Sequence, residues 1–234
     1  MQKSVLVAGS HGTIGKAVCE RLKLAGYETL TISRAQETSL SHLNIAMTEP
    51  ESVAAMSNWL SERMKNLVGV IHCAGFLHEG DKGPEKNLKQ LNADWLHQSI
   101  QVNTMSHVHL AQALDSLIRR RSELRWLSLS AKVGSIEDNG LGGWYSYRMS
   151  KAALNMFIKN LSIEWGRRAS GTSVIAMHPG TTPSALSEPF TRNWPKHKLY
   201  SPELTAERIV SVFESMSAEG TGKLYHHDGS VIPW

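Results

Sequence analysis

Short apolar runs alternate along the chain with longer segments of helical periodicity. The first run, from Ser4 to Ala8, is rich in β-branched residues and is typical of a strand buried on both faces. Similar runs predict strands at 29–32, 43–47, 68–72, 124–129, 173–177 and 223–225. Apolar spacing of three and four residues predicts helices at 16–25, 48–65, 92–117 and 145–167. Thr48 is the predicted N-cap of the second of these helices, and Ser201 is the predicted N-cap of a last helix. The alternation of strands and helices predicts one doubly wound α/β domain over residues 1–234.

Composition narrows the class of protein. Of 234 residues, 41% are hydrophobic and 20% charged, which fits a soluble globule better than a disordered chain. The net charge of +4 is mild, and the dense basic spots at 119–121 and 196–198 fit a helix end and a loop, so we expect no nucleic-acid partner. Cys19 and Cys73 give no disulfide framework. With neither a visible signal peptide nor a long apolar run, we expect a cytoplasmic protein without a membrane partner.

A glycine-rich turn follows the first predicted strand. Its seven residues are Gly9, Ser10, His11, Gly12, Thr13, Ile14 and Gly15. Between a strand and a helix, such a turn brings backbone amides close to a pyrophosphate at the helix N-terminus. The alternative is a tight turn that binds nothing.

The second predicted strand ends at Ser33 and Arg34. In a dinucleotide-binding fold this strand end faces the adenosine ribose, where an acidic residue binds the 2′-hydroxyl of NAD. An arginine suits the 2′-phosphate of NADP instead. We therefore expect the cofactor to be NADP(H), with NAD(H) as the second choice. The alternative is that Arg34 is an ordinary surface residue with no role in binding.

Tyr147 and Lys151 lie four residues apart in a predicted helix, so they share one helical face. A phenol has a pKa near ~10 and is a weak acid at neutral pH. A neighbouring ammonium favours the phenolate, so we expect Lys151 to lower the pKa of Tyr147. Such a pair protonates a carbonyl or accepts a proton from an alcohol. The alternative is a chance pair on a solvated face.

Several motifs then occur together in order. They are the glycine turn, Cys73-Ala74-Gly75, Asn103, Ser130, Tyr147 with Lys151, and Pro179-Gly180. In this order they resemble the short-chain dehydrogenase/reductase family, with its Rossmann-type fold, over essentially the whole chain. Residues 134–136, 142–148 and 228–234 are similar to the C-factor-like branch. That branch includes proteins named for cell–cell signalling and others that behave as carbonyl reductases.

The resemblance implies roles for individual residues. Tyr147 would be the general acid/base. Lys151 would hold the nicotinamide ribose, and Asn103 a water that links Lys151 to solvent. Thr182 would contact the nicotinamide carboxamide. The strand-end residues Cys73, Ala74, Gly75, Pro179 and Gly180 would line the cofactor. Family members pair the helices at 92–117 and 145–167 across a two-fold axis, so we expect a homodimer or homotetramer.

The sequence departs from the family pattern in three places. The glycines are separated by two and two residues, where the family has three and one, with Thr13 near the usual second glycine. The acidic residue often found after the third strand is replaced by Asn44 or Ala46. The position of the substrate-orienting serine is Ala131, which leaves Ser130, narrowly preferred, or Ser135 for that role.

We therefore expect an NADP(H)-dependent oxidoreductase that interconverts a small-molecule carbonyl and an alcohol of undefined identity. The alternative is a dinucleotide-binding sensor or signalling protein without significant turnover. A sugar-nucleotide epimerase is disfavoured, because only about fifty residues follow Gly180, too few for a substrate domain. We predict no metal: His226-His227-Asp228 reads as a loop. Trp194 either lines a substrate lid or packs on its own loop.

Overall fold

The computed structural model describes residues 2–119 and 122–234. Within these residues one sheet runs in the order β3-β2-β1-β4-β5-β6-β7-β8, and only the last pair, β7 and β8, is antiparallel. The strands are β1 (Ser4–Ala8), β2 (Glu28–Ser33), β3 (His42–Asn44), β4 (Leu67–His72), β5 (Arg125–Leu129), β6 (Ser173–His178), β7 (Leu224–His226) and β8 (Val231–Ile232). Strand order reverses at β1, which lies between β2 and β4, and ligands of open α/β sheets bind at such a switch point.

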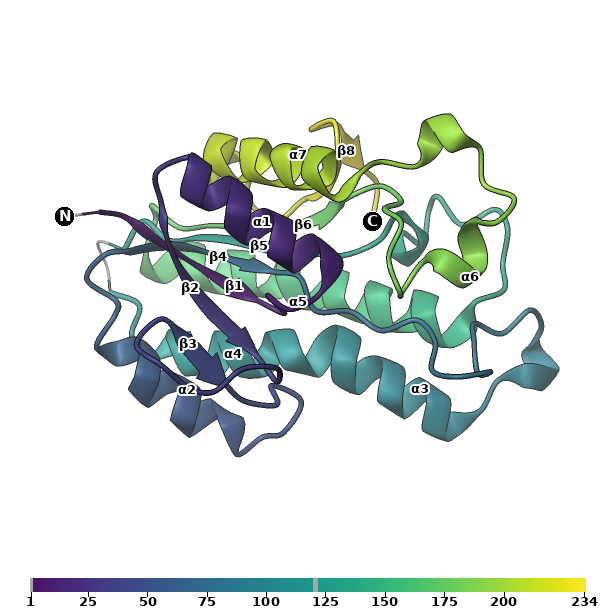
Figure 1. Cartoon of the computed structure of the whole chain (residues 1–234), viewed down its shortest axis with the longest axis horizontal. Helices are drawn as coiled ribbons and strands as arrows, with labels where there is room; N and C mark the ends of the chain where they lie inside the picture. Colours follow the sequence, from purple (N-terminus) through teal and green to yellow (C-terminus); the bar gives the residue numbers. More distant parts are fainter. Residues whose placement is uncertain (1, 120–121) are drawn as a thin grey trace.

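Helices cover both faces of the sheet, which confirms the predicted doubly wound α/β domain (Figure 1). One face carries α1 (Thr13–Leu24) and α7 (Pro202–Ser215). The other carries α2 (Ser52–Ser61), α3 (Ala93–Ile100), α4 (Ser106–Asp115) and α5 (Tyr145–Arg168). A short helix, α6 (Glu188–Thr191), lies beyond the right-hand edge of the sheet in Figure 1. Within the described residues, no helix is long and apolar enough to cross a membrane.

Strand β1 is buried on both faces, as its sequence predicts. Val5 and Val7 pack in one core layer with Phe213 of α7. Leu6 and Ala8 pack in the other layer, together with Leu114 of α4. Burying one such side chain contributes about 1.5–3 kcal/mol, so the strand is a rigid support for the turn that follows it.

Most predicted elements are present, with boundaries displaced by one to four residues. The predicted N-cap Thr48 is wrong: its hydroxyl donates to Glu49 (2.9 Å), two turns follow, and α2 starts at Ser52. The helix predicted at 92–117 is interrupted by a π-helical turn, Gln101–Met105. Helix α6 and strand β8 were not predicted, because each is too short to show a period. Arg120 and Arg121, part of the first basic spot, lie outside the described residues.

Candidate active site

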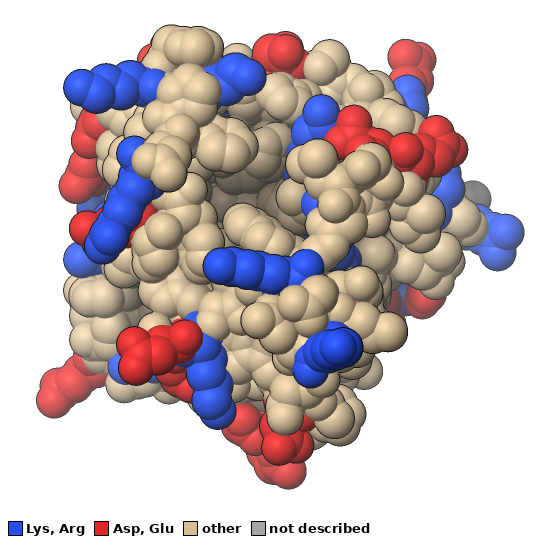
Figure 2. All heavy atoms as spheres, turned by 90° about the vertical axis from the view of Figure 1, so that its right-hand side faces the viewer, with Lys and Arg blue, Asp and Glu red and all other residues tan. Residues whose placement is uncertain are grey.

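The parallel strands β1, β2, β4, β5 and β6 end at one edge of the sheet, and each is followed by residues singled out in the sequence. This edge faces the right-hand side of Figure 1. Figure 2 looks onto that side and shows a hollow with Lys and Arg side chains around it. The topology therefore brings residues from all parts of the chain to one depression.

The glycine turn between β1 and α1 lies against the end of β4. Gly9 has φ +74°, and a Cβ there would come within 2.6 Å of the Ala74 nitrogen. A Cβ on Gly15 would come within 2.3 Å of the Gly9 oxygen. Both glycines are needed for this close packing. His11, Gly12 and Thr13 are exposed, and Ser10 and Ile14 are half-buried.

The N-terminus of α1 fits an anionic group. Gly12 is its N-cap, and within the described chain it has no side-chain cap and no acidic residue in its first turn. A Cβ on Gly12 would have a single neighbour, the Gly9 oxygen at 3.6 Å, so the approach is open. Amides at such a terminus favour negative charge, so the site suits a pyrophosphate.

Strand β2 brings Ser33 and Arg34 beside this turn. Ser33 is buried, and its hydroxyl accepts a hydrogen bond from the Ala35 amide (3.3 Å) and lies 3.5 Å from His42 Nε2. Arg34 is exposed, and no ion pair joins it to an acidic side chain within the described residues. The guanidinium is therefore available to an anion.

Asn103 and Lys151 meet at the end of β4. A Cβ on Gly75 would lie 3.7 Å from Asn103 Oδ1 and 4.0 Å from Lys151 Nζ. Asn103, fully buried in the π-helical turn, accepts from the Phe76 amide and donates to the Phe76 carbonyl, both at 2.8 Å. It also donates to Ser150 Oγ (3.0 Å). π-turns inside helices often occur at functional sites, and here the turn fixes Asn103 next to Lys151.

Burial controls the protonation of the pair on α5. Lys151 is 3% exposed and donates from Nζ to the Leu129 carbonyl (3.0 Å). Its burial lowers its pKa to about 7. Its ammonium lies 5.9 Å from the centre of the Tyr147 ring, and burial raises the pKa of Tyr147 well above its usual value. The sequence led us to expect that Lys151 lowers this pKa, whereas burial of the phenol raises it.

The two candidate serines differ in their hydrogen bonds. Ser130 Oγ donates to Asn155 Oδ1 (2.6 Å). Ser135 Oγ accepts from the Asp138 amide (3.1 Å), and its own proton has no acceptor among the residues that the structure describes. Both serines are buried, and Ala131 between them is also buried. The structure places both on the segment after β5.

After β6 the chain turns through Pro179 and Gly180. Gly180 has φ +83° and packs against Tyr200 and His227, where a Cβ would clash at 2.8–2.9 Å. Thr182 is 3% exposed, and its hydroxyl pairs with that of Thr205 on α7 (2.7 Å). Its side chain therefore anchors the loop to α7.

An aromatic group that sequence analysis did not identify lies beside Tyr147. The Trp144 ring is 6.2 Å from Tyr147 and 5.3 Å from Phe190, and Phe190 is 5.6 Å from His78. His78 Nε2 is 2.7 Å from the Ala185 carbonyl, which ties the α6 segment to the loop after β4. Trp194, for which the sequence left open a substrate lid or packing on its own loop, is 45% exposed. Trp144 has a left-handed backbone conformation, which the sequence does not reveal, so this aromatic group could not be predicted.

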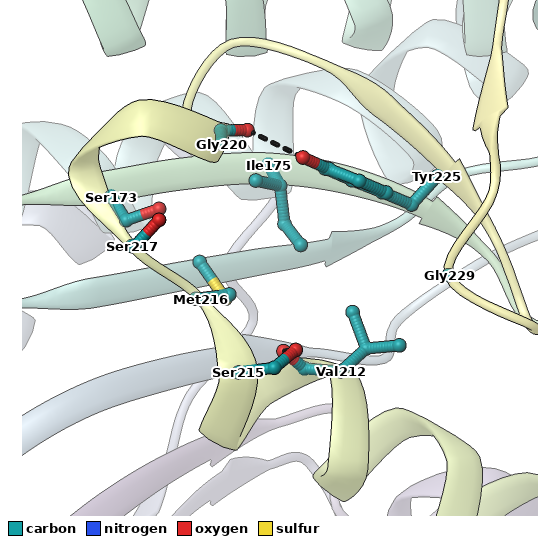
Figure 3. A pocket seen from close by; sticks show the side chains of 9 residues that line it. All are labelled: Ser173, Ile175, Val212, Ser215, Met216, Ser217, Gly220, Tyr225 and Gly229. Atoms are coloured by element: carbon teal, nitrogen blue, oxygen red, sulfur yellow. Dashed lines mark hydrogen bonds between the residues drawn. The ribbon is translucent and has the colours of Figure 1, made fainter.

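Cys73 directly follows β4, next to Ala74, and burial raises the pKa of its thiol, which disfavours the nucleophilic thiolate. Among the described residues, no group of three His, Cys, Asp or Glu side chains could hold a metal ion. A cavity of about 200 Å³ lies toward the amino end of β6, away from the carboxyl ends of the strands (Figure 3). Its lining includes Ser173, Met216 and Tyr225.

The chain is similar to known proteins in sequence and in fold. A family model described as short chain dehydrogenase matches residues 3–194. The chain is 28% identical over 237 residues to 1-hydroxy-2-glutathionyl-2-methyl-3-butene dehydrogenase of Rhodococcus sp. (strain AD45), covering 99% of both chains. It is 26% identical over 133 residues to C-signal of Myxococcus xanthus, covering 57% of this chain and 75% of that one. Its fold is similar to NADPH-bound carbonyl reductase from chicken fatty liver, with TM-score 0.83, 21% identity, and coverage of 100% and 99%.

Proposed function

The chain belongs to the short-chain dehydrogenase family, and on that premise we propose that it is an NADP(H)-dependent oxidoreductase that interconverts a carbonyl and an alcohol. The observation that carries the proposal is the convergence of Asn103 and Lys151 on Gly75, with Tyr147 one turn before Lys151 on α5. Such an arrangement supports a site in which Tyr147 is the proton donor beside a nicotinamide ribose.

The nicotinamide, when bound, supplies or accepts the hydride, and the protein provides orientation and a proton. The amides of the glycine turn hold the pyrophosphate, and Arg34 holds the 2′-phosphate. Lys151 binds the ribose hydroxyls, and Asn103 holds a water beside it. Thr182 contributes to the carboxamide site, where its hydroxyl pairs with that of Thr205 and its carbonyl accepts from the Ser187 hydroxyl.

Tyr147 gives its phenolic proton to the carbonyl oxygen, or takes a proton from the alcohol. A phenol is protonated at neutral pH, and burial raises the pKa of Tyr147 further; the protonated phenol is the form that carbonyl reduction needs. The hydrogen bonds favour Ser135 over Ser130 as the second donor to the substrate oxygen, because the Ser130 proton is already given to Asn155.

A panel assay tests the proposal. NADPH consumption is followed with aldehydes, ketones and quinones. NADP⁺ reduction is followed with alcohols, including a glutathione-conjugated alcohol because the Rhodococcus relative is named for one. We expect NADPH-dependent turnover of at least one compound.

The likeness to C-signal supports the second candidate, a dinucleotide-binding signalling protein. The same experiment separates the two candidates when NADPH binding is titrated in parallel. Tight NADPH binding without turnover across the panel would favour the signalling protein and contradict the enzyme.

A further inference from the structure

Glu85 lies at the N-terminus of α5, where it contacts Ser146, a residue 61 positions later in the sequence. Its side chain is 3% exposed. Oε2 accepts from the Ser146 amide (3.1 Å), and Oε1 accepts a short hydrogen bond from the Ser146 hydroxyl. No ion pair joins Glu85 to a Lys or Arg within the described residues, so its charge faces the helix terminus.

Helix α5 has no cap of its own. Its N-cap residue is Trp144, with φ +53°, and no side-chain capping bond is present within the described chain. The first amides of a helix need acceptors, and the helix dipole favours negative charge there. An N-cap side chain normally accepts from the second or third helical amide. Ser146 is the second helical residue, so Glu85 makes the bond that a local cap would make.

The Glu85 backbone strengthens this link. Its carbonyl accepts from the Trp144 amide (2.5 Å). Gly143 passes close to it with φ +64°, and a Cβ there would lie 3.4 Å from the Glu85 oxygen, at ordinary contact distance. The loop after β4 therefore holds both the turn that enters α5 and the first residues of the helix.

We propose that Glu85 is a positioning residue for Tyr147, acting as a remote N-cap that fixes the first turn of α5 through Ser146. Tyr147 directly follows Ser146, so movement of this turn displaces the phenol. A displacement of about 1 Å in a catalytic group can cost on the order of 10²-fold in rate. The part of this proposal that concerns catalysis rests on the proposed function.

The test compares Glu85→Ala, Glu85→Gln and Ser146→Ala with a control in the same loop, Glu79→Ala. Glu79 is exposed and bonds only Gln98 among the described side chains (3.2 Å). Hydrogen exchange of residues 143–150, kcat and NADPH affinity are measured for each protein. In Glu85→Ala we expect exchange in this segment to rise about 10-fold, as for loss of a cap.

In the same variant kcat should fall at least ~10-fold, while NADPH affinity should stay within about 2-fold, because the glycine turn is untouched. Exchange and kcat of Glu85→Gln should lie between those of the unmodified protein and Glu85→Ala, since its amide oxygen still accepts one bond but carries no charge. If the alanine variant does not fold, Glu85→Gln provides the test of the proposal. Effects of Glu85→Ala and Ser146→Ala on kcat should be strongly non-additive in the double variant.

Exchange and kcat like those of Glu79→Ala would overturn the proposal, as would faster exchange with unchanged kcat. An unmodified protein without turnover would refute the proposed function instead, and the exchange measurement would still decide whether Glu85 caps α5.

Discussion

At the scale of single residues, desolvation sets the chemistry of the site. Lys151 is 3% exposed and its pKa falls to about 7, while burial raises the pKa of Tyr147. The two shifts have the same cause, because burial disfavours the charged form of either group. The Tyr147–Lys151 pair could be identified from its four-residue spacing. Its protonation could not, since the burial of Lys151, which donates to the Leu129 carbonyl, depends on residues distant in sequence.

Arg34 should determine the choice of cofactor. The unmodified protein should bind NADPH more tightly than NADH, because the exposed guanidinium can pair with the 2′-phosphate. Arg34→Asp should reverse that order by removing this contact and adding repulsion. Fluorescence titration with both nucleotides measures the change, and equal affinities in the unmodified protein would count against the assignment.

Ser135 should matter more than Ser130 for the chemical step. Ser135→Ala should lower kcat by about 10-fold or more, because a donor to the developing oxyanion is lost. Ser130→Ala should mainly lower thermal stability, because it leaves Asn155 Oδ1 without its donor. Steady-state kinetics and melting temperatures of the two variants distinguish them. The opposite pattern would return the role to Ser130.

At the scale of elements, periodicity accounts for what was predictable. The buried strand at Ser4–Ala8 and the helix over Tyr145–Arg168 show clear patterns in sequence, and both are present. The π-helical turn Gln101–Met105 was not predictable, because one inserted residue barely changes the apolar spacing. The cap of α5 by Glu85 was also hidden, since nothing local marks a partner 61 residues away.

Helix α7, unlike α5, is capped by the residue that directly precedes it, Ser201. Ser201 Oγ accepts from the Leu204 amide (3.2 Å), as the sequence predicted. Ser201→Ala should lower the free energy of unfolding by about 1 kcal/mol. Ser201→Asp should preserve it, because the carboxylate can accept the same bond. Urea denaturation measures both, and an unchanged alanine variant would show that the cap contributes nothing.

At the scale of the whole molecule, one face of α5 exposes apolar side chains. Met149, Met156 and Ile163 are spaced by seven residues, so they lie on one stripe, and they are 47%, 62% and 42% exposed. Apolar stripes of this kind often mark contacts between protein molecules. The stripe supports the expectation of a homodimer or homotetramer in which α5 helices pair.

Met156→Glu should therefore shift the protein toward a monomer, because it places a charge in the proposed contact. Leu24→Glu is the matched control, since Leu24 is 82% exposed at the end of α1, away from α5. Light scattering at micromolar concentration reports the state of each protein. A monomeric unmodified protein would rule out the assembly.

The role of Tyr147 is tested most directly by the pH dependence of turnover in both directions, measured for Tyr147→Phe and for the unmodified enzyme. The raised pKa of Tyr147 should keep carbonyl reduction active to alkaline pH before it falls. Alcohol oxidation should rise with pH over a lower interval, because the positive nicotinamide of NADP⁺ favours the phenolate. Tyr147→Phe should bind NADPH normally and lose at least ~10²-fold in turnover. Near-full turnover in that variant, with NADPH binding intact, would show that the proton comes from another group and would contradict the account.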